Sequence, residues 1–172
     1  MHAMTIHDPI VSDLANDHRR AVDEVNSWRG HCIDCFARIE LAVVEALDAL
    51  ILSGRMPSLK RASLFGPRIE MMKVALRDDI FGKKASSPRK SLNALENVLA
   101  RRNALVHGVG QIWIRPHGEW LWKYRYIGNA GAKTIETGSI DSGEAKLIEN
   151  HLSSQCRSLQ TTLANLTADL TN

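Results

Sequence analysis

Three side chains that are close in the sequence could act together on a phosphate ester: Arg102, Asn103 and His107. An arginine guanidinium stays charged and presents a fixed fork of donors that matches phosphate oxygens. A histidine imidazole titrates near neutral pH, so it can accept or give up a proton. The Asn103 amide could orient the imidazole or bind a phosphate oxygen. We therefore take Arg102 and His107 as candidate catalytic residues, with Asn103 in support.

These residues close a helix that the spacing of apolar residues predicts over about residues 88–107. Arg102 falls within the apolar stripe of that helix, between Val98 and Val106 around the axis. Arginine is almost never buried without a partner, so this position indicates an ion pair, an interface or a functional site. Asn103 and His107 are i,i+4 neighbours and project together from the flank of the stripe. The stripe itself consists of Leu92, Leu95, Leu99 and Val106.

The run R-N-A-L-V-H at residues 102–107, followed by Gly108, resembles the signature of HEPN domains, the "higher eukaryotes and prokaryotes nucleotide-binding" superfamily. The resemblance covers this motif and the helical layout from about residue 18 to 108, with a further helix after it. It implies an all-helical fold and a metal-independent endoribonuclease, of which many are toxins or defence proteins. It also implies a homodimer whose two motifs face each other, RNA as substrate, and an antitoxin protein as partner.

Cleavage of RNA by its own 2′-hydroxyl needs a base for the hydroxyl proton, an acid for the leaving 5′-oxygen, and stabilisation of the phosphoryl oxygens. One histidine does not readily act as acid and base simultaneously, and a dimer that presents two copies of His107 removes the difficulty. The last helical turn favours the imidazolium form of His107 through the helix dipole, whereas Arg102 opposes it. No cofactor or metal is expected.

A structural role for the same residues stays open. Arg102 could pair with Glu40 or Glu45 of the long first helix, while His107 closes the helix C-terminus. The protein would then be a non-catalytic HEPN-like binding or assembly module whose motif organises the dimer interface. Side chains that face solvent across a basic cleft favour the enzyme, and an internal pair with Glu40 or Glu45 favours the module.

Length and composition predict one domain spanning residues 1–172. The chain has 172 residues, 44% hydrophobic and 24% charged, which is ordinary for a globular protein that builds its core without disulfides or metal. No run approaches the ~20 apolar residues of a membrane span, and the N-terminus does not follow the pattern of a signal peptide. We therefore expect a cytoplasmic protein that does not associate with membranes.

Charge is distributed unevenly, and residues 55–90 are the basic part of the chain. This stretch holds ten lysines and arginines against Glu70, Asp78 and Asp79, whereas the first 54 residues are net acidic. A basic segment directly before the Arg/His motif suits a polyanionic substrate. The alternative is a solvated helix face followed by a lysine-rich loop.

The fold class that these patterns predict is mostly α, a bundle of four or five helices with a small antiparallel β-hairpin inserted before the last helix. The first helix begins near Asp8-Pro9 and ends at Ser53-Gly54, as one long helix or two nearly collinear ones, with Gly30 as the expected break or kink. The other expected segments are a helix from Pro67 to Asp79, a basic loop over residues 81–88, the helix at 88–107, and a last helix that starts within residues 141–144.

The insertion covers about residues 111–140. Gln111–Arg115 and Trp120–Ile127 alternate as strands around a turn at residues 116–119, and Thr134–Ile140 could add a third strand. The aromatic residues of the second strand share one face, and Lys123 and Arg125 share the other. Together with Arg115 they could contact RNA, although a face of this kind more often covers a core or an interface.

The cysteines and one histidine are assigned to the core. Cys32 and Cys35 have the CxxC spacing of zinc ligands, but a structural zinc needs four ligands and no second pair accompanies them. Both fall on the apolar stripe of the first helix, as Cys156 does on the last, so all three are expected to be buried and to form neither a metal site nor a disulfide. His18 lies on the same stripe, which predicts a core or interface position.

Overall fold

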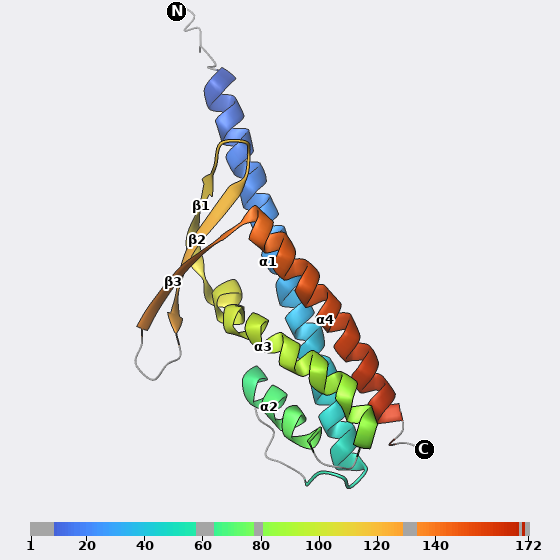
Figure 1. Ribbon diagram of the computed structural model, residues 1–172. Helices are drawn as coiled ribbons and strands as arrows, with labels where there is room; N and C mark the ends of the chain where they lie inside the picture. The colour runs from blue at the N-terminus through green and yellow to red at the C-terminus, as the bar shows by residue number, and fades with distance from the viewer. Residues whose placement is uncertain (1–8, 58–63, 78–80, 129–133, 169, 171–172) are drawn as a thin grey trace, which may run out of the picture. The chain divides into compact units, whose positions relative to one another are not determined.

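The computed structural model describes residues 9–57, 64–77, 81–128, 134–168 and 170, and the chain is mostly helical. The mostly α prediction is confirmed, but the insertion is a three-stranded antiparallel sheet of order β1-β2-β3 and not a hairpin. Figure 1 shows the elements, which are α1 (Pro9–Leu52), α2 (Phe65–Ala75), the 3₁₀ helix η1 (Gly82–Ala85), α3 (Ser86–His107), β1 (Val109–Ile114), β2 (Trp120–Gly128), β3 (Thr134–Asp141) and α4 (Ser142–Ala168).

The chain divides into two compact units, and helices α1, α3 and α4 contribute to both. The sheet unit consists of residues 1–31 and 103–147, and the helical unit consists of residues 32–102 and 148–172. We describe each unit by itself. In the described parts of both, no helix is long and apolar enough to cross a membrane.

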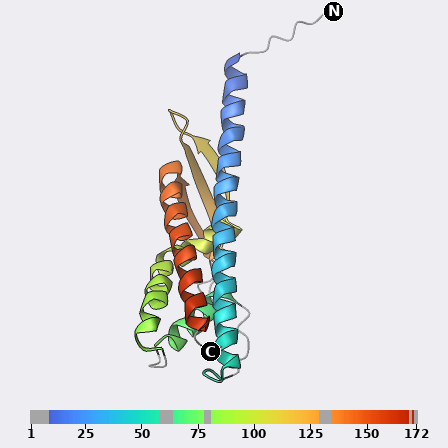
Figure 2. The same ribbon diagram turned by 90° about the vertical axis from the view of Figure 1, so that its right-hand side faces the viewer.

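The sheet unit forms because one face of β2 is aromatic. Trp120 and Trp122 are buried, and their rings lie 5.8 and 6.1 Å from the ring of Trp28 on α1. The indole of Trp120 also donates a hydrogen bond to the Glu24 carboxylate at 3.0 Å. The expected packing role of this aromatic face is therefore confirmed, and it places the strands beside the N-terminal half of α1 (Figure 2).

The helical unit buries the apolar stripes of its helices, as their spacing predicts. On α1 the buried positions include Phe36, whose ring meets the ring of Phe65 on α2 edge to face at 6.2 Å. A hydrogen bond of 2.9 Å joins the hydroxyls of Ser91 on α3 and Ser158 on α4. The fully buried side chains of this unit include Ile39, Leu50, Ile69, Met72, Leu76, Leu92, Leu95, Leu152 and Leu159.

Helix α1 is continuous through Gly30, so the expectation of one long helix is confirmed and the break at Gly30 is wrong. A glycine inside a helix costs only ~1 kcal/mol relative to alanine. Burial of residues on both sides outweighs that cost, since Trp28 is buried in the sheet unit and Cys32 in the helical unit. The predicted C-terminus is confirmed, because α1 ends at Leu52 and Gly54 adopts a positive φ of 70°.

Two other boundaries differ from the expected ones. Helix α2 ends at Ala75 instead of Asp79, and residues 78–80 lie outside the described part of the chain. The carbonyl of Leu76, just past the helix, accepts a hydrogen bond from the Arg89 guanidinium. The expected loop over residues 81–88 contains η1 and the first turn of α3. Pro88 is tolerated in this turn because the N–H that proline lacks would have no partner within the helix.

Candidate functional site

Arg102 is half-buried on α3 and rests on an aromatic ring. Its guanidinium carbon lies 5.1 Å from the ring centre of Phe65, a cation–π arrangement. Within the part of the chain that the structure describes, its buried Nε has no hydrogen-bond acceptor. The Arg102 guanidinium therefore lies against an apolar ring without a carboxylate partner among the described residues.

The acids that were candidates to pair with Arg102 are engaged elsewhere or exposed. The Glu40 carboxylate binds the Arg68 guanidinium at 2.5 Å, and both side chains are about three-quarters buried. Glu45 is exposed on α1. Among the described residues the internal pair that would favour a purely structural Arg102 is therefore not formed.

His107 is the last residue of α3 and its side chain is exposed, while Asn103 one turn earlier is half-buried. The Gly108 N–H donates to the Ala104 carbonyl at 2.8 Å, which closes the helix. On a helix of ~100° and ~1.5 Å per residue, Arg102 and His107 are separated by ~140° around the axis and ~7.5 Å along it. One copy of α3 thus directs the two side chains away from each other.

Arg29 on α1 is a residue of this region that sequence reasoning missed. Its Nε and Nη2 donate to the Leu105 carbonyl at 3.1 and 2.8 Å, and Nη2 also donates to the Gly108 carbonyl at 3.1 Å. Its guanidinium carbon lies 4.6 Å from the ring centre of Trp122. Burial lowers the pKa of Arg29 below its usual value. Arg29, and not His107, is the side chain that donates to the carbonyls at this helix end, and no local pattern indicates this because the partners are 76 and 79 residues apart.

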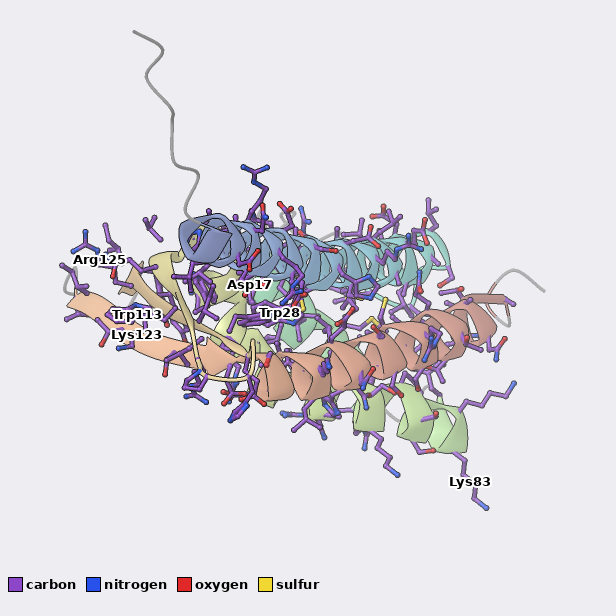
Figure 3. All side chains as sticks on the ribbon, turned by 90° about the horizontal axis from the view of Figure 1, so that it is seen from above. Asp17, Trp28, Lys83, Trp113, Lys123 and Arg125 are labelled. Atoms are coloured by element: carbon purple, nitrogen blue, oxygen red, sulfur yellow. The ribbon has the colours of Figure 1, made fainter. Side chains whose placement is uncertain are left out.

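Within the described part of the basic stretch at residues 55–90, some cations form ion pairs and others are exposed to solvent. Arg68 binds Glu40, and the buried Lys73 binds Glu70 at 2.9 Å. Lys83 is exposed and extends away from the helices (Figure 3). Lys60 and Arg61 lie outside the described residues.

The three cysteines are buried and free, so their predicted core position is confirmed. Burial raises the pKa of the Cys32 thiol to about 12, with smaller contributions from Glu149 and Cys35. Burial also raises the pKa of the Cys156 thiol to about 11, and Cys35 adds to the effect. The described residues hold no group of three or more histidines, cysteines or acids arranged for a metal ion.

His18 is exposed, so its predicted core position is wrong within this chain. Leu14, one turn earlier on the same stripe of α1, is also 62% exposed. The apolar repeat of α1 therefore extends beyond the residues that this chain itself covers.

All three candidate residues lie on α3, with Arg102 in the helical unit and Asn103 and His107 in the sheet unit. Their chemistry comprises an uncompensated guanidinium, an amide and an exposed imidazole near one helix end. Comparisons with protein-family models, with curated proteins and with solved structures find no match to this chain.

Proposed function

We propose that this protein is a HEPN-like, metal-independent endoribonuclease that acts as a homodimer, with Arg102 and His107 as catalytic residues and Asn103 in support. The observation that carries the proposal is the guanidinium of Arg102, which among the described residues has no carboxylate partner and keeps a buried Nε–H without an acceptor. A fixed fork of unused donors suits the oxygens of a phosphodiester, and an exposed imidazole lies on the same helix.

The reaction is a transesterification within the RNA chain. The ribose 2′-oxygen attacks the adjacent phosphorus, the bond from phosphorus to the 5′-oxygen breaks, and a 2′,3′-cyclic phosphate remains. One His107 accepts the 2′-hydroxyl proton, a second His107 protonates the leaving 5′-oxygen, and Arg102 stabilises the charged phosphoryl oxygens. The ~140° between Arg102 and His107 on α3 supports a site built from two copies, because a facing helix can supply the missing group.

Cleavage of a labelled single-stranded RNA in the presence of EDTA tests the activity. We expect cleavage by the parent, complete loss with His107→Ala, and a loss on the order of 10²–10³ in rate with Arg102→Ala, because one electrostatic stabiliser of the transition state is removed. His117→Asn is the matched control, since His117 is an exposed histidine with a positive φ of 81°, which asparagine tolerates. A parent that cleaves none of the RNAs tested would contradict the proposal.

Light scattering at micromolar concentration tests the dimer. The exposed Leu14 and His18 on the stripe of α1 support a surface that a second copy covers. A monomer would count against the composite site. A dimer without nuclease activity would instead favour the non-catalytic binding or assembly module.

A further inference from the structure

The sheet unit has a second face, opposite the buried tryptophans, which we call the outer sheet face. The strand register places Lys123 of β2 between Gln111 and Ser139, and Arg125 of β2 between Val109 and Thr137. Because side chains alternate along a strand, all of these point away from Trp120 and Trp122. The outer sheet face consists of Val109, Gln111, Trp113, Leu121, Lys123, Arg125, Ile127, Ile135, Thr137, Ser139 and, at the end of β3, Asp141.

A groove of about 740 Å³ crosses the strands on this face. Its two walls are the row of Gln111, Lys123 and Ser139 and the row of Val109, Arg125 and Thr137. Its floor is the backbone between those rows, at Gly110, Tyr124 and Gly138. The groove is therefore open to solvent and crosses neighbouring strands, so an extended chain can enter it.

The groove is positively charged, and nothing in its described lining compensates for it. Lys123 and Arg125 are both exposed, and none of the lining residues is acidic. Asp141, the acid near the end of β3, binds Arg115 at 3.6 Å and accepts the Glu144 backbone N–H at 2.9 Å. The Asp141 carboxylate thus has partners outside the groove lining.

The other acid of β3, Glu136, lies on the opposite face of the sheet. Glu136 is paired in register with Tyr126, on the face that carries the tryptophans, and accepts the Tyr126 hydroxyl there. The groove on the outer sheet face therefore presents two cations together with amide and hydroxyl donors, a set complementary to an anion.

Flat and apolar surface accompanies this charge. Trp113 is 52% exposed, and the Lys123 ammonium lies 4.5 Å from its ring centre. Figure 3 shows Trp113 and Lys123 side by side, with Arg125 at the same end of the sheet. Val109, Ile127 and Ile135 are also more than 60% exposed. An exposed aromatic ring next to cations can stack a nucleobase while the cations contact the backbone.

We propose that the outer sheet face binds single-stranded RNA, with phosphates at Lys123 and Arg125 and a base stacked on Trp113. A single strand leaves its bases free to stack, whereas a duplex hides them. Lys123 and Arg125 are two positions apart on β2, about 6.8 Å, a separation that neighbouring phosphates of an extended strand can match. The inference rests on the proposed function for the choice of RNA and adds the substrate class and the surface that holds it.

The test measures binding of a fluorescently labelled uridine-rich 12-mer RNA by anisotropy, with the full chain carrying His107→Ala so that no cleavage occurs. In this background Lys123→Gln with Arg125→Gln should weaken binding at least tenfold and reduce the slope of log K against log salt by about 1.4, because ~0.7 is lost per contact with a single-strand phosphate. Trp113→Ala should weaken binding about tenfold through lost stacking, and Trp113→Phe should restore most of it.

The matched control is Lys146→Gln with Arg157→Gln, which removes the same charge from exposed positions on α4 and should leave the salt slope unchanged. Circular dichroism and thermal melting verify that each variant is folded. Binding that is insensitive to the sheet variants, equal competition by a duplex of the same length, or a change in oligomeric state instead of RNA affinity would each overturn the inference.

The two proposals fail separately. If RNA binding depends on the outer sheet face but the parent does not cleave RNA, the nuclease proposal is refuted and the RNA-binding proposal is supported. If the parent cleaves RNA but the sheet variants bind RNA normally, the RNA-binding proposal is refuted and the nuclease proposal is supported.

Discussion

The guanidinium of Arg29 binds the carbonyl oxygen of Leu105 through two of its nitrogens, Nε at 3.1 Å and Nη2 at 2.8 Å. The same side chain reaches the Gly108 carbonyl and lies over Trp122, so it connects α1, the end of α3 and β2 within the sheet unit. The last carbonyls of a helix lack partners in the helix itself and carry its negative dipole end. A fixed cation satisfies both needs, and it anchors the helix end that carries His107.

We expect Arg29→Leu to lower the free energy of unfolding by about 2–3 kcal/mol, because hydrogen bonds from a charged donor are lost and buried carbonyls lose their partner. Arg29→Lys should recover only part of this, since one ammonium cannot reproduce the fork. Chemical denaturation measures both. Arg19→Leu, at an exposed position of the same helix, should change stability by less than ~0.5 kcal/mol, and an equal effect of the two leucine variants would refute the anchoring role.

Gly108 is a structural requirement of the motif. A Cβ at this position would lie 2.2 Å from the Ala104 carbonyl oxygen and 3.1 Å from the Trp122 ring. Gly108→Ala should therefore destabilise the protein by about 1–3 kcal/mol, the usual cost of overpacking. Gly30→Ala, where a Cβ meets nothing within 4 Å, should be neutral or slightly stabilising. Thermal melting compares the two, and a stable Gly108→Ala variant would contradict this account.

Arg102 and Arg68 should differ in stability measurements. Arg68→Leu leaves the partly buried Glu40 carboxylate without its partner and should cost about 1–3 kcal/mol. Arg102→Leu strands no carboxylate among the described residues and removes a buried N–H that has no acceptor, so it should cost less than ~1 kcal/mol, close to the lost cation–π contact. Denaturant titration of both variants decides. A large loss in the free energy of unfolding of Arg102→Leu would indicate that Arg102 has a buried partner and a structural role.

The buried thiols should make stability fall at alkaline pH. An unfolded cysteine has a pKa of ~8.5, whereas the pKa is raised to about 12 for Cys32 and about 11 for Cys156 in the folded chain. The folded state therefore favours the neutral thiol, so this stability is complete below pH ~8.5 and is lost as the pH rises toward 11 and 12. Denaturation between pH 7.5 and 10.5 should show the decrease, and Cys32→Ala should reduce it by about half because the thiol of Cys156 remains.

The same burial predicts slow modification. At pH 8 a chromogenic disulfide reagent should react slowly with the native protein and rapidly with all three cysteines in denaturant. Rapid reaction of the native protein, or zinc at stoichiometric level by elemental analysis, would contradict the assignment of these cysteines to the core.

Several features of this protein were determined by the sequence alone, because local periodicity fixes which residues share one face of a helix or strand. The stripe of α1 predicted the buried Cys32 and Cys35, and the alternation in β2 predicted its aromatic and basic faces. The C-terminus of α1 at Gly54 followed from backbone freedom that glycine alone provides cheaply. These are properties of short segments, so no distant residue was needed to predict them.

Only the tertiary structure decided which side chains meet. Arg102 rests on Phe65 while Glu40 binds Arg68, and Arg29 reaches Leu105 across 76 residues. His18 follows the apolar spacing of α1 and is nevertheless exposed, because a stripe predicts burial only where another segment covers it. Long-range contacts decide which group pairs with each charge and which segment packs on each apolar face. Local patterns in the sequence do not show contacts between distant residues.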